Sequence, residues 1–202
     1  MPPPVCHVYI MKHPQRMLTL AFVRPGPDDP IFNRLVARMC KHGICHTELV
    51  FEDNMAFSIF AGQEVFFRPR TLSNPEYELV TLAVSHAEYI SAYSFCKQAM
   101  GSRIGFTDAG MLAAYFQPKG CPCINTGSSL VAGHTFCSKI VTEALQFAGV
   151  REAEALSPCT TTPSCLYEAV KDSQRKLLSS VPYKREQLKH SGVITGRPLV
   201  MQ

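Results

Sequence analysis

One cysteine and one histidine in this chain stand where each could take part in nucleophilic catalysis. Cys137 opens a run in which apolar residues recur at helical spacing, and Gly149 follows as a typical helix end. The pattern predicts a buried helix with Cys137 in its first turn. Because the unpaired N–H groups and the dipole of a helix start favour negative charge, a thiol there is shifted toward thiolate. The thiolate is the form that attacks carbonyl groups, so we expect Cys137 to be a nucleophile.

A cysteine nucleophile needs a base within hydrogen-bond reach and a third group that orients the base. His46 begins a predicted strand, where its side chain is rigidly aimed. A three-residue turn at 52–54 would place Ser58 opposite Glu48 and diagonal to His46. A turn one residue shorter or longer would move Ser58 to the other face, whereas Glu48 shares a face with His46 in either case. We expect His46 to be the base and Ser58 to orient it, with Glu48 as the alternative.

The remaining pattern predicts the elements that must position these residues. Strands are expected at 5–11, 17–23, 45–51, 55–60, 63–68 and 77–83, and helices at 30–42, 85–101, 106–116, 137–148 and 163–171. Residues 45–60 form a predicted hairpin, and the short links between neighbouring strands favour an antiparallel sheet. The expected architecture is α+β, with helices packed on this sheet as one domain over residues 1–175.

Two of the predicted helices carry start signals. Ser85 and Glu88 have the spacing of a capping box. In the first helix, Asp29 is expected to be the cap and Pro30 the first helical residue. The buried face of that helix is predicted to consist of Ile31, Leu35, Val36 and Met39.

The composition indicates the class of protein and the cellular compartment that we expect. Apolar residues make up 46% of the chain and charged residues 18%, which is typical of a globular protein. The nine cysteines are an odd number, and residues 1–7 lack the features of a secretion signal. We therefore expect free thiols in a reducing, cytoplasmic compartment. No apolar run is long enough to predict a transmembrane segment.

The positive charge is concentrated at the end of the chain. Residues 171–202 hold seven Lys and Arg residues against two acids, whereas the whole chain carries +4. We interpret residues 176–202 as a solvated basic tail, because no aromatic interleaving or reader motif favours nucleic-acid binding.

Three segments together resemble the circularly permuted branch of the NlpC-type papain-like cysteine peptidase and amidase superfamily. They are residues 45–51, which read Cys-His-Thr-Glu-Leu-Val-Phe, the Phe-Ser pair at 57–58, and the Phe-Cys-Ser run at 136–138. The branch places its histidine strand before its cysteine helix, and the pattern is similar to that of its viral and phage members. It also includes lecithin retinol acyltransferase-like enzymes and bacterial amidases.

The resemblance implies a fold and an activity. His46 and Cys137 match the base and the nucleophile of the family, and Ser58 stands where its acyltransferase-like members carry the orienting polar residue. The implied fold is permuted papain-like, and the implied activity is that of a cysteine hydrolase or acyltransferase without a cofactor. Its substrate would be a peptide, another amide or an acyl lipid, cleaved through an acyl-cysteine intermediate.

Two other hypotheses use the same residues. Cys121, Cys123, His134 and Cys137 are four soft ligands within a short span, and they could form a structural zinc site. Zinc would occupy the Cys137 thiolate and prevent catalysis. Alternatively, the chain is a binding module that keeps the fold without turnover, because serine is a weak orienting residue at position 58.

Overall fold

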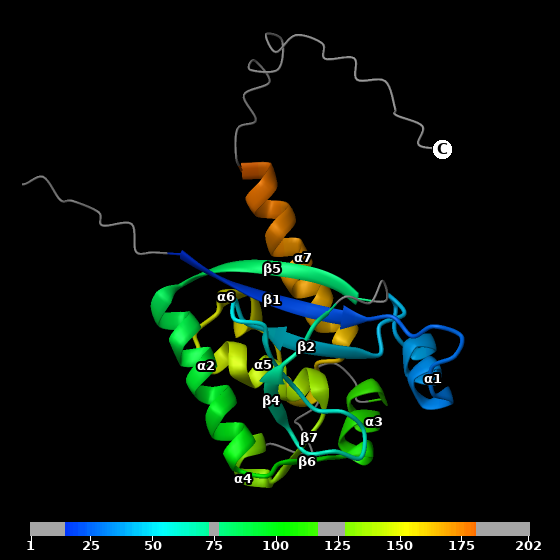
Figure 1. Cartoon of the computed structure of the whole chain (residues 1–202). Coiled ribbons are helices and arrows are strands. Elements are labelled where there is room, and N and C mark those ends of the chain that lie inside the picture. The colour runs from blue at the N-terminus through cyan, green and yellow to red at the C-terminus, as the bar shows by residue number, and fades with distance from the viewer. Residues whose placement is uncertain (1–14, 73–76, 117–127, 181–202) are drawn as a thin grey trace, which may run out of the picture.

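An antiparallel sheet of five strands organises the chain (Figure 1). The structure, a computed structural model, describes residues 15–72, 77–116 and 128–180. The strands are β1 (Gln15–Val23), β2 (His46–Val50), β3 (Met55–Ser58), β4 (Phe66–Pro69) and β5 (Tyr77–Ser85). Their order in the sheet is β4-β3-β2-β1-β5, so the long strand β5 pairs with β1 and not with its chain neighbour β4.

Seven α-helices lie in the described part of the chain. They are α1 (Ile31–Met39), α2 (His86–Gly101), α3 (Asp108–Phe116), α4 (Ser129–Ala132), α5 (Cys137–Phe147), α6 (Arg151–Glu154) and α7 (Pro163–Ser180). A 3₁₀ turn, η1 (Pro158–Thr160), precedes α7, and the short strands β6 (Gly105–Phe106) and β7 (His134–Thr135) pair in parallel. The α+β class with helices packed on an antiparallel sheet is therefore as predicted.

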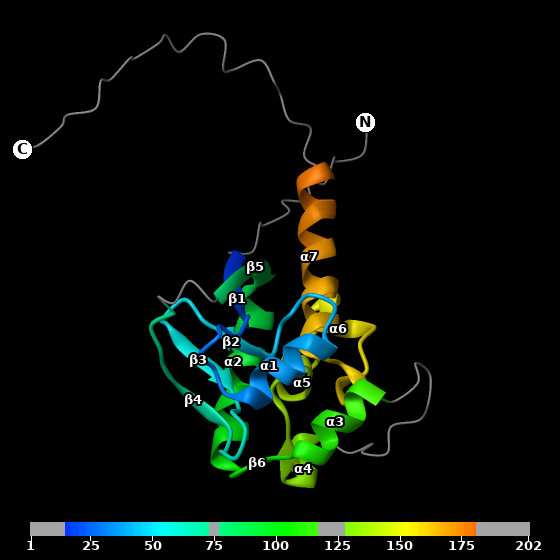
Figure 2. The ribbon, with the colours of Figure 1, turned by 90° about the vertical axis from the view of Figure 1, so that its right-hand side faces the viewer.

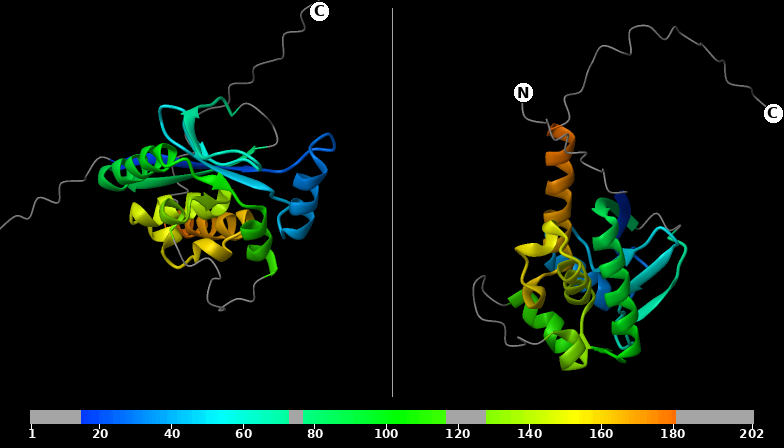
Figure 3. Two further views of the ribbon diagram at one scale, coloured as in Figure 1. Left: turned by 90° about the horizontal axis from the view of Figure 1, so that it is seen from below. Right: turned by 90° about the vertical axis from the view of Figure 1, so that its left-hand side faces the viewer.

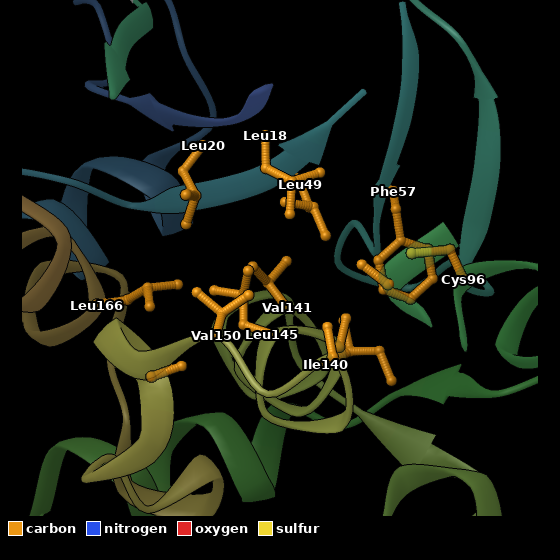
Figure 4. Close-up of a cluster of buried hydrophobic side chains, with 14 of the residues drawn as sticks. Leu18, Leu20, Leu49, Phe57, Cys96, Ile140, Val141, Leu145, Val150 and Leu166 are labelled. Carbon is orange, nitrogen blue, oxygen red and sulfur yellow. The ribbon is translucent and has the colours of Figure 1, made fainter. Parts of the chain in front are cut away.

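The main core lies between one face of the sheet and the helices α2, α5 and α7 (Figure 3). Leu18, Leu20 and Leu49 of the sheet point toward Val141 and Leu145 of α5 (Figure 4). All five side chains have no exposed surface. Because each fully buried aliphatic side chain contributes about 1.5–3 kcal/mol, this contact fixes α5 firmly beneath the central strands.

Most predicted elements are found close to their expected positions. The hairpin of β2 and β3 pairs Leu49 with Phe57, and Phe51 N donates to Met55 O across the turn at 2.9 Å. This register is that of a three-residue turn, so Glu48 faces the position of Ser58. The capping box predicted at the start of α2 is formed in both directions, and Gly149 has the positive φ of 77° expected after α5.

The prediction for α1 is wrong in two respects. The N-cap is Pro30 and makes no side-chain bond, because the Asp29 carboxylate accepts the Gly26 N–H at 2.8 Å instead. The predicted buried face is mostly exposed, and only Val36 of its four residues is buried. The helix carries two apolar rows one residue apart, and the row of Phe32 and Val36 is the one that packs on the body with the α3 residue Met111. Sequence periodicity alone could not choose between these rows.

Other predictions concern the ends of the chain. The helix predicted to end near residue 171 continues to Ser180, so position 175, the predicted end of the domain, falls within α7. The strand predicted at 5–11 and most of the predicted tail lie outside the described residues. Among the described helices, none combines the length and the apolar character that a membrane crossing requires.

Candidate active site

His46 is the first residue of β2, the central strand of the sheet. Its backbone is paired with Val23 of β1, and its ring stacks on Phe60, with centroids 4.5 Å apart and planes at 20°. Only 8% of His46 is exposed. The strand and the stacked ring together hold the imidazole in one orientation, as the sequence predicted for a residue on a strand.

Cys137 is the first residue of α5 and is likewise buried. The N-cap is Phe136, which has no side-chain acceptor, so no side chain caps the first N–H groups of the helix. Because α5 packs on β2, the two elements bring Cys137 and His46 together at one cavity of about 240 Å³. The helix start therefore offers backbone N–H donors beside a buried sulfur.

The first two turns of α5 are held by buried polar contacts. The Ser138 hydroxyl donates to Thr161 O at 2.6 Å, and the Lys139 ammonium lies 3.9 Å from the Glu143 carboxylate. Both Glu143 oxygens accept the Ser129 N–H at 3.1 Å, which ties α4 to α5. Burial raises the pKa of Glu143. These contacts fix the position of the helix start that carries Cys137.

The titration of His46 reflects its neighbours. Burial by itself lowers the pKa of His46, but hydrogen bonds and electrostatic interactions with Cys137 and Glu48 raise it to about 9. The imidazole is therefore cationic at neutral pH. An imidazolium beside a cysteine sulfur is the arrangement that supports a thiolate nucleophile.

Glu48 is the residue that faces the imidazole from the same strand. It is fully buried, and its Oε1 lies 3.5 Å from His46 Nε2. Within the described residues, His46 Nε2 has no closer hydrogen-bond partner.

Two further residues hold Glu48 in place. Arg70 Nε lies 3.4 Å from Glu48 Oε2, and the Tyr77 hydroxyl donates to Glu48 Oε1 at 3.4 Å. Arg70 also donates to the Tyr77 hydroxyl at 3.0 Å. Neither residue could be predicted from the sequence, because Arg70 follows β4 and Tyr77 begins β5, which lie at opposite edges of the sheet. No local pattern indicates that these segments meet at Glu48.

Ser58 lies on β3 next to Glu48, as the turn length predicted. Its hydroxyl is fully buried and donates to the backbone oxygen of Thr47 at 2.6 Å. The structure thus places the Ser58 hydroxyl on the main chain of β2, whereas the Glu48 carboxylate faces the His46 ring.

The cavity beside Cys137 is largely apolar. Phe32 and Val36 of α1 and Met111 of α3 line it, as does Cys45, which precedes His46 in the chain. Burial raises the pKa of the Cys45 thiol to about 12, so this second sulfur stays protonated at neutral pH. A cavity with apolar walls and a few convergent polar groups is typical of small-molecule and catalytic sites.

The residues of the zinc hypothesis are only partly described. His134 lies on β7 and Cys137 on α5, whereas Cys121 and Cys123 lie outside the described residues. Across residues 15–72, 77–116 and 128–180, no group of three or more His, Cys, Asp or Glu side chains is placed to hold a metal ion.

Comparisons of the chain with protein-family models, with curated proteins and with solved structures found no match.

Proposed function

We propose that the protein is a thiol-dependent hydrolase or acyltransferase, with Cys137 as the nucleophile and His46 as the base. The observation that carries this proposal is the shared cavity, where a buried cysteine at a helix start adjoins a histidine whose pKa is raised to about 9. The alternative of an inactive binding module gives no reason for a cationic imidazole beside this sulfur.

The reaction follows from the groups in the cavity. With the pKa of His46 raised to about 9, the proton that the two residues share lies on His46 at neutral pH, and Cys137 adds as the thiolate to the carbonyl carbon of an amide, ester or thioester. The backbone N–H of Cys137 at the start of α5 stabilises the oxyanion of the tetrahedral intermediate. His46 then gives its proton to the leaving amine, alcohol or thiol, and the acyl group stays on the sulfur.

The acyl-cysteine is resolved by a second nucleophile. His46 deprotonates water or an acceptor hydroxyl or amine, which attacks the thioester and releases the Cys137 sulfur. Water gives hydrolysis, and another acceptor gives acyl transfer. The chemistry of Cys137 and His46 is the same in both cases.

In this proposal, Glu48 is the group that orients the His46 ring. Its carboxylate faces His46 Nε2, so the other ring nitrogen, Nδ1, is assigned to proton exchange with Cys137. Arg70 and Tyr77 hold the carboxylate in turn. A buried charge with such partners can stabilise the imidazolium that forms at each step.

We further propose that the fold is the permuted papain-like one. The observations that support it are the antiparallel sheet with the histidine at the start of a central strand, followed in the chain by the helix that begins with Cys137. This order of strand and helix is the one that the resemblance in sequence implies.

A turnover assay with matched variants tests the proposal. Wild-type protein is incubated with a panel of activated thioesters, esters and amides, beside Cys137→Ala and Cys45→Ala. Because both cysteines line the same cavity, Cys45→Ala controls for the loss of a thiol there. We expect turnover by wild type and Cys45→Ala and none by Cys137→Ala. Equal turnover by all three proteins would contradict the assignment.

A further inference from the structure

The helices α1 and α3 lie on the same side of the molecule (Figures 1 and 2), and each carries exposed apolar side chains. In α1, Ile31, Leu35 and Met39 are spaced one turn apart and are 76%, 53% and 37% exposed. In α3, Leu112 and Phe116 are also one turn apart, and they are 38% and 73% exposed. We call these five residues the apolar patch. Exposed apolar residues that lie together mark interaction sites, whereas single ones need no explanation.

Basic side chains border the apolar patch. Arg34 and Arg38 are exposed, lie one turn apart on α1, and flank the row that Ile31 begins. Among the described residues, neither arginine forms an ion pair. Two exposed acids belong to the same helices: Asp28 precedes α1, and Asp108 is the first residue of α3. The exposed surface of α1 therefore has an apolar row with a row of two arginines beside it.

We propose that the apolar patch with Arg34 and Arg38 is a docking surface for an anionic phospholipid bilayer. A helix with apolar and basic residues side by side is suited to lie in the interface of such a membrane. The helix α1 stands at the periphery of the molecule (Figure 3), and a fluid bilayer receives projecting side chains without a complementary pocket. The arginines add attraction to anionic headgroups, which no apolar partner surface would supply.

The same two helices connect this surface to the cavity. Their opposite sides contribute Phe32, Val36 and Met111 to the lining beside Cys137. Docking through α1 and α3 would thus hold the cavity close to the membrane surface. The inference depends on exposed residues only and stands whether or not Cys137 turns over a substrate.

Vesicle co-sedimentation of the full chain carrying Cys137→Ala tests the proposal without interference from any turnover. The probes are phosphatidylcholine vesicles with and without about 20% phosphatidylserine. We expect binding to the anionic vesicles that weakens by about five-fold for each arginine replaced in Arg34→Gln and Arg38→Gln. Binding should also fall with rising salt. The double variant Ile31→Ser and Leu35→Ser should bind at least about ten-fold more weakly, because it removes the apolar anchor.

Two control variants match these changes elsewhere on the surface. Ile90 of α2 is 50% exposed and Arg151 of α6 has a side chain that is 79% exposed, so Ile90→Ser and Arg151→Gln should bind as the parent does. Circular dichroism verifies that each variant is folded. Failure of the parent to sediment, or equal binding by patch and control variants, would overturn the proposal. A dimer in light scattering that Leu35→Ser dissociates would instead assign the patch to a second copy and would also overturn it.

Discussion

Glu48 Oε1 lies 3.5 Å from His46 Nε2, and both residues are held on the same face of the central strand β2. The carboxylate has no exposed surface, so its charge acts on the imidazole with little screening by water. Burial alone would lower the pKa of His46, and the contacts with Cys137 and Glu48 raise it to about 9. Glu48 is therefore the residue whose replacement should change the chemistry of His46 most selectively.

Replacing this carboxylate should change the pH dependence of activity. Because His46 must be protonated to donate a proton to the leaving group, activity should fall as pH rises through the pKa of His46, about 9. Glu48→Gln removes a negative charge that raises this pKa, so the alkaline limb should move to lower pH by about one unit or more. The measurement is kcat/KM against pH for both proteins. An alkaline limb that stays in place in Glu48→Gln would exclude the carboxylate as the orienting group.

The variant Ser58→Ala tests whether Ser58 or Glu48 is the group that orients His46. The Ser58 hydroxyl donates to Thr47 O, and its loss removes this buried hydrogen bond, which should lower the free energy of unfolding by about 0.5–1.5 kcal/mol. The alkaline limb of kcat/KM should stay where it is in wild type. Urea denaturation measures the stability, and the pH profile of kcat/KM measures the position of the alkaline limb. A limb shifted as far as in Glu48→Gln would give Ser58 the orienting role.

The two cysteines of the cavity should differ in reactivity. Burial raises the pKa of the Cys45 thiol to about 12, so almost none of it is thiolate at neutral pH. Cys137 adjoins a cationic imidazole, so iodoacetamide at about pH 6–7 should alkylate Cys137 and leave Cys45 unmodified. Mass spectrometry of the tryptic peptides identifies the modified residue. Alkylation of both residues at equal rates would contradict the pairing of Cys137 with His46.

The packing of α5 on the sheet should dominate the stability of the fold around the site. Ile140 of α5 has no exposed surface, and Ile140→Ala should lower the free energy of unfolding by about 2–5 kcal/mol. Ile90→Ala provides a matched control on α2, where the side chain is 50% exposed and the cost should stay below about 1 kcal/mol. Urea denaturation of the two variants tests the comparison. Similar losses in both would mean that α5 is not anchored as described.

The sequence was most informative where local rules decide the structure. Two strand-like segments joined by a short acidic turn were enough to predict the β2–β3 hairpin, and the register that places Glu48 opposite Ser58 was expected only for a three-residue turn, which is the turn found. The start of α5 at Cys137 followed from helical periodicity and from Gly149. These features depend on residues close together in the chain.

Features that depend on distant contacts could not be predicted. Tyr77 reaches Glu48 because β5 pairs with β1, and Arg70 reaches it from the end of β4 at the opposite edge of the sheet. Nothing in their local sequence indicates either contact. The exposed row of α1 was predicted to be buried because Ile31 and Leu35 have the same spacing as Phe32 and Val36. The choice between the two rows is made by α3, which lies much later in the chain.

The most direct test of the account is to trap the acyl group on the protein. Wild type, Cys137→Ala and His46→Ala are mixed with an activated acyl ester at neutral pH, and intact masses are recorded before and after digestion. We expect one acyl group on Cys137 of wild type, none in Cys137→Ala, and acylation of His46→Ala slowed by about 100-fold or more. Acylation of Cys137 at the same rate without His46, or acyl groups on other residues only, would contradict the pair of nucleophile and base.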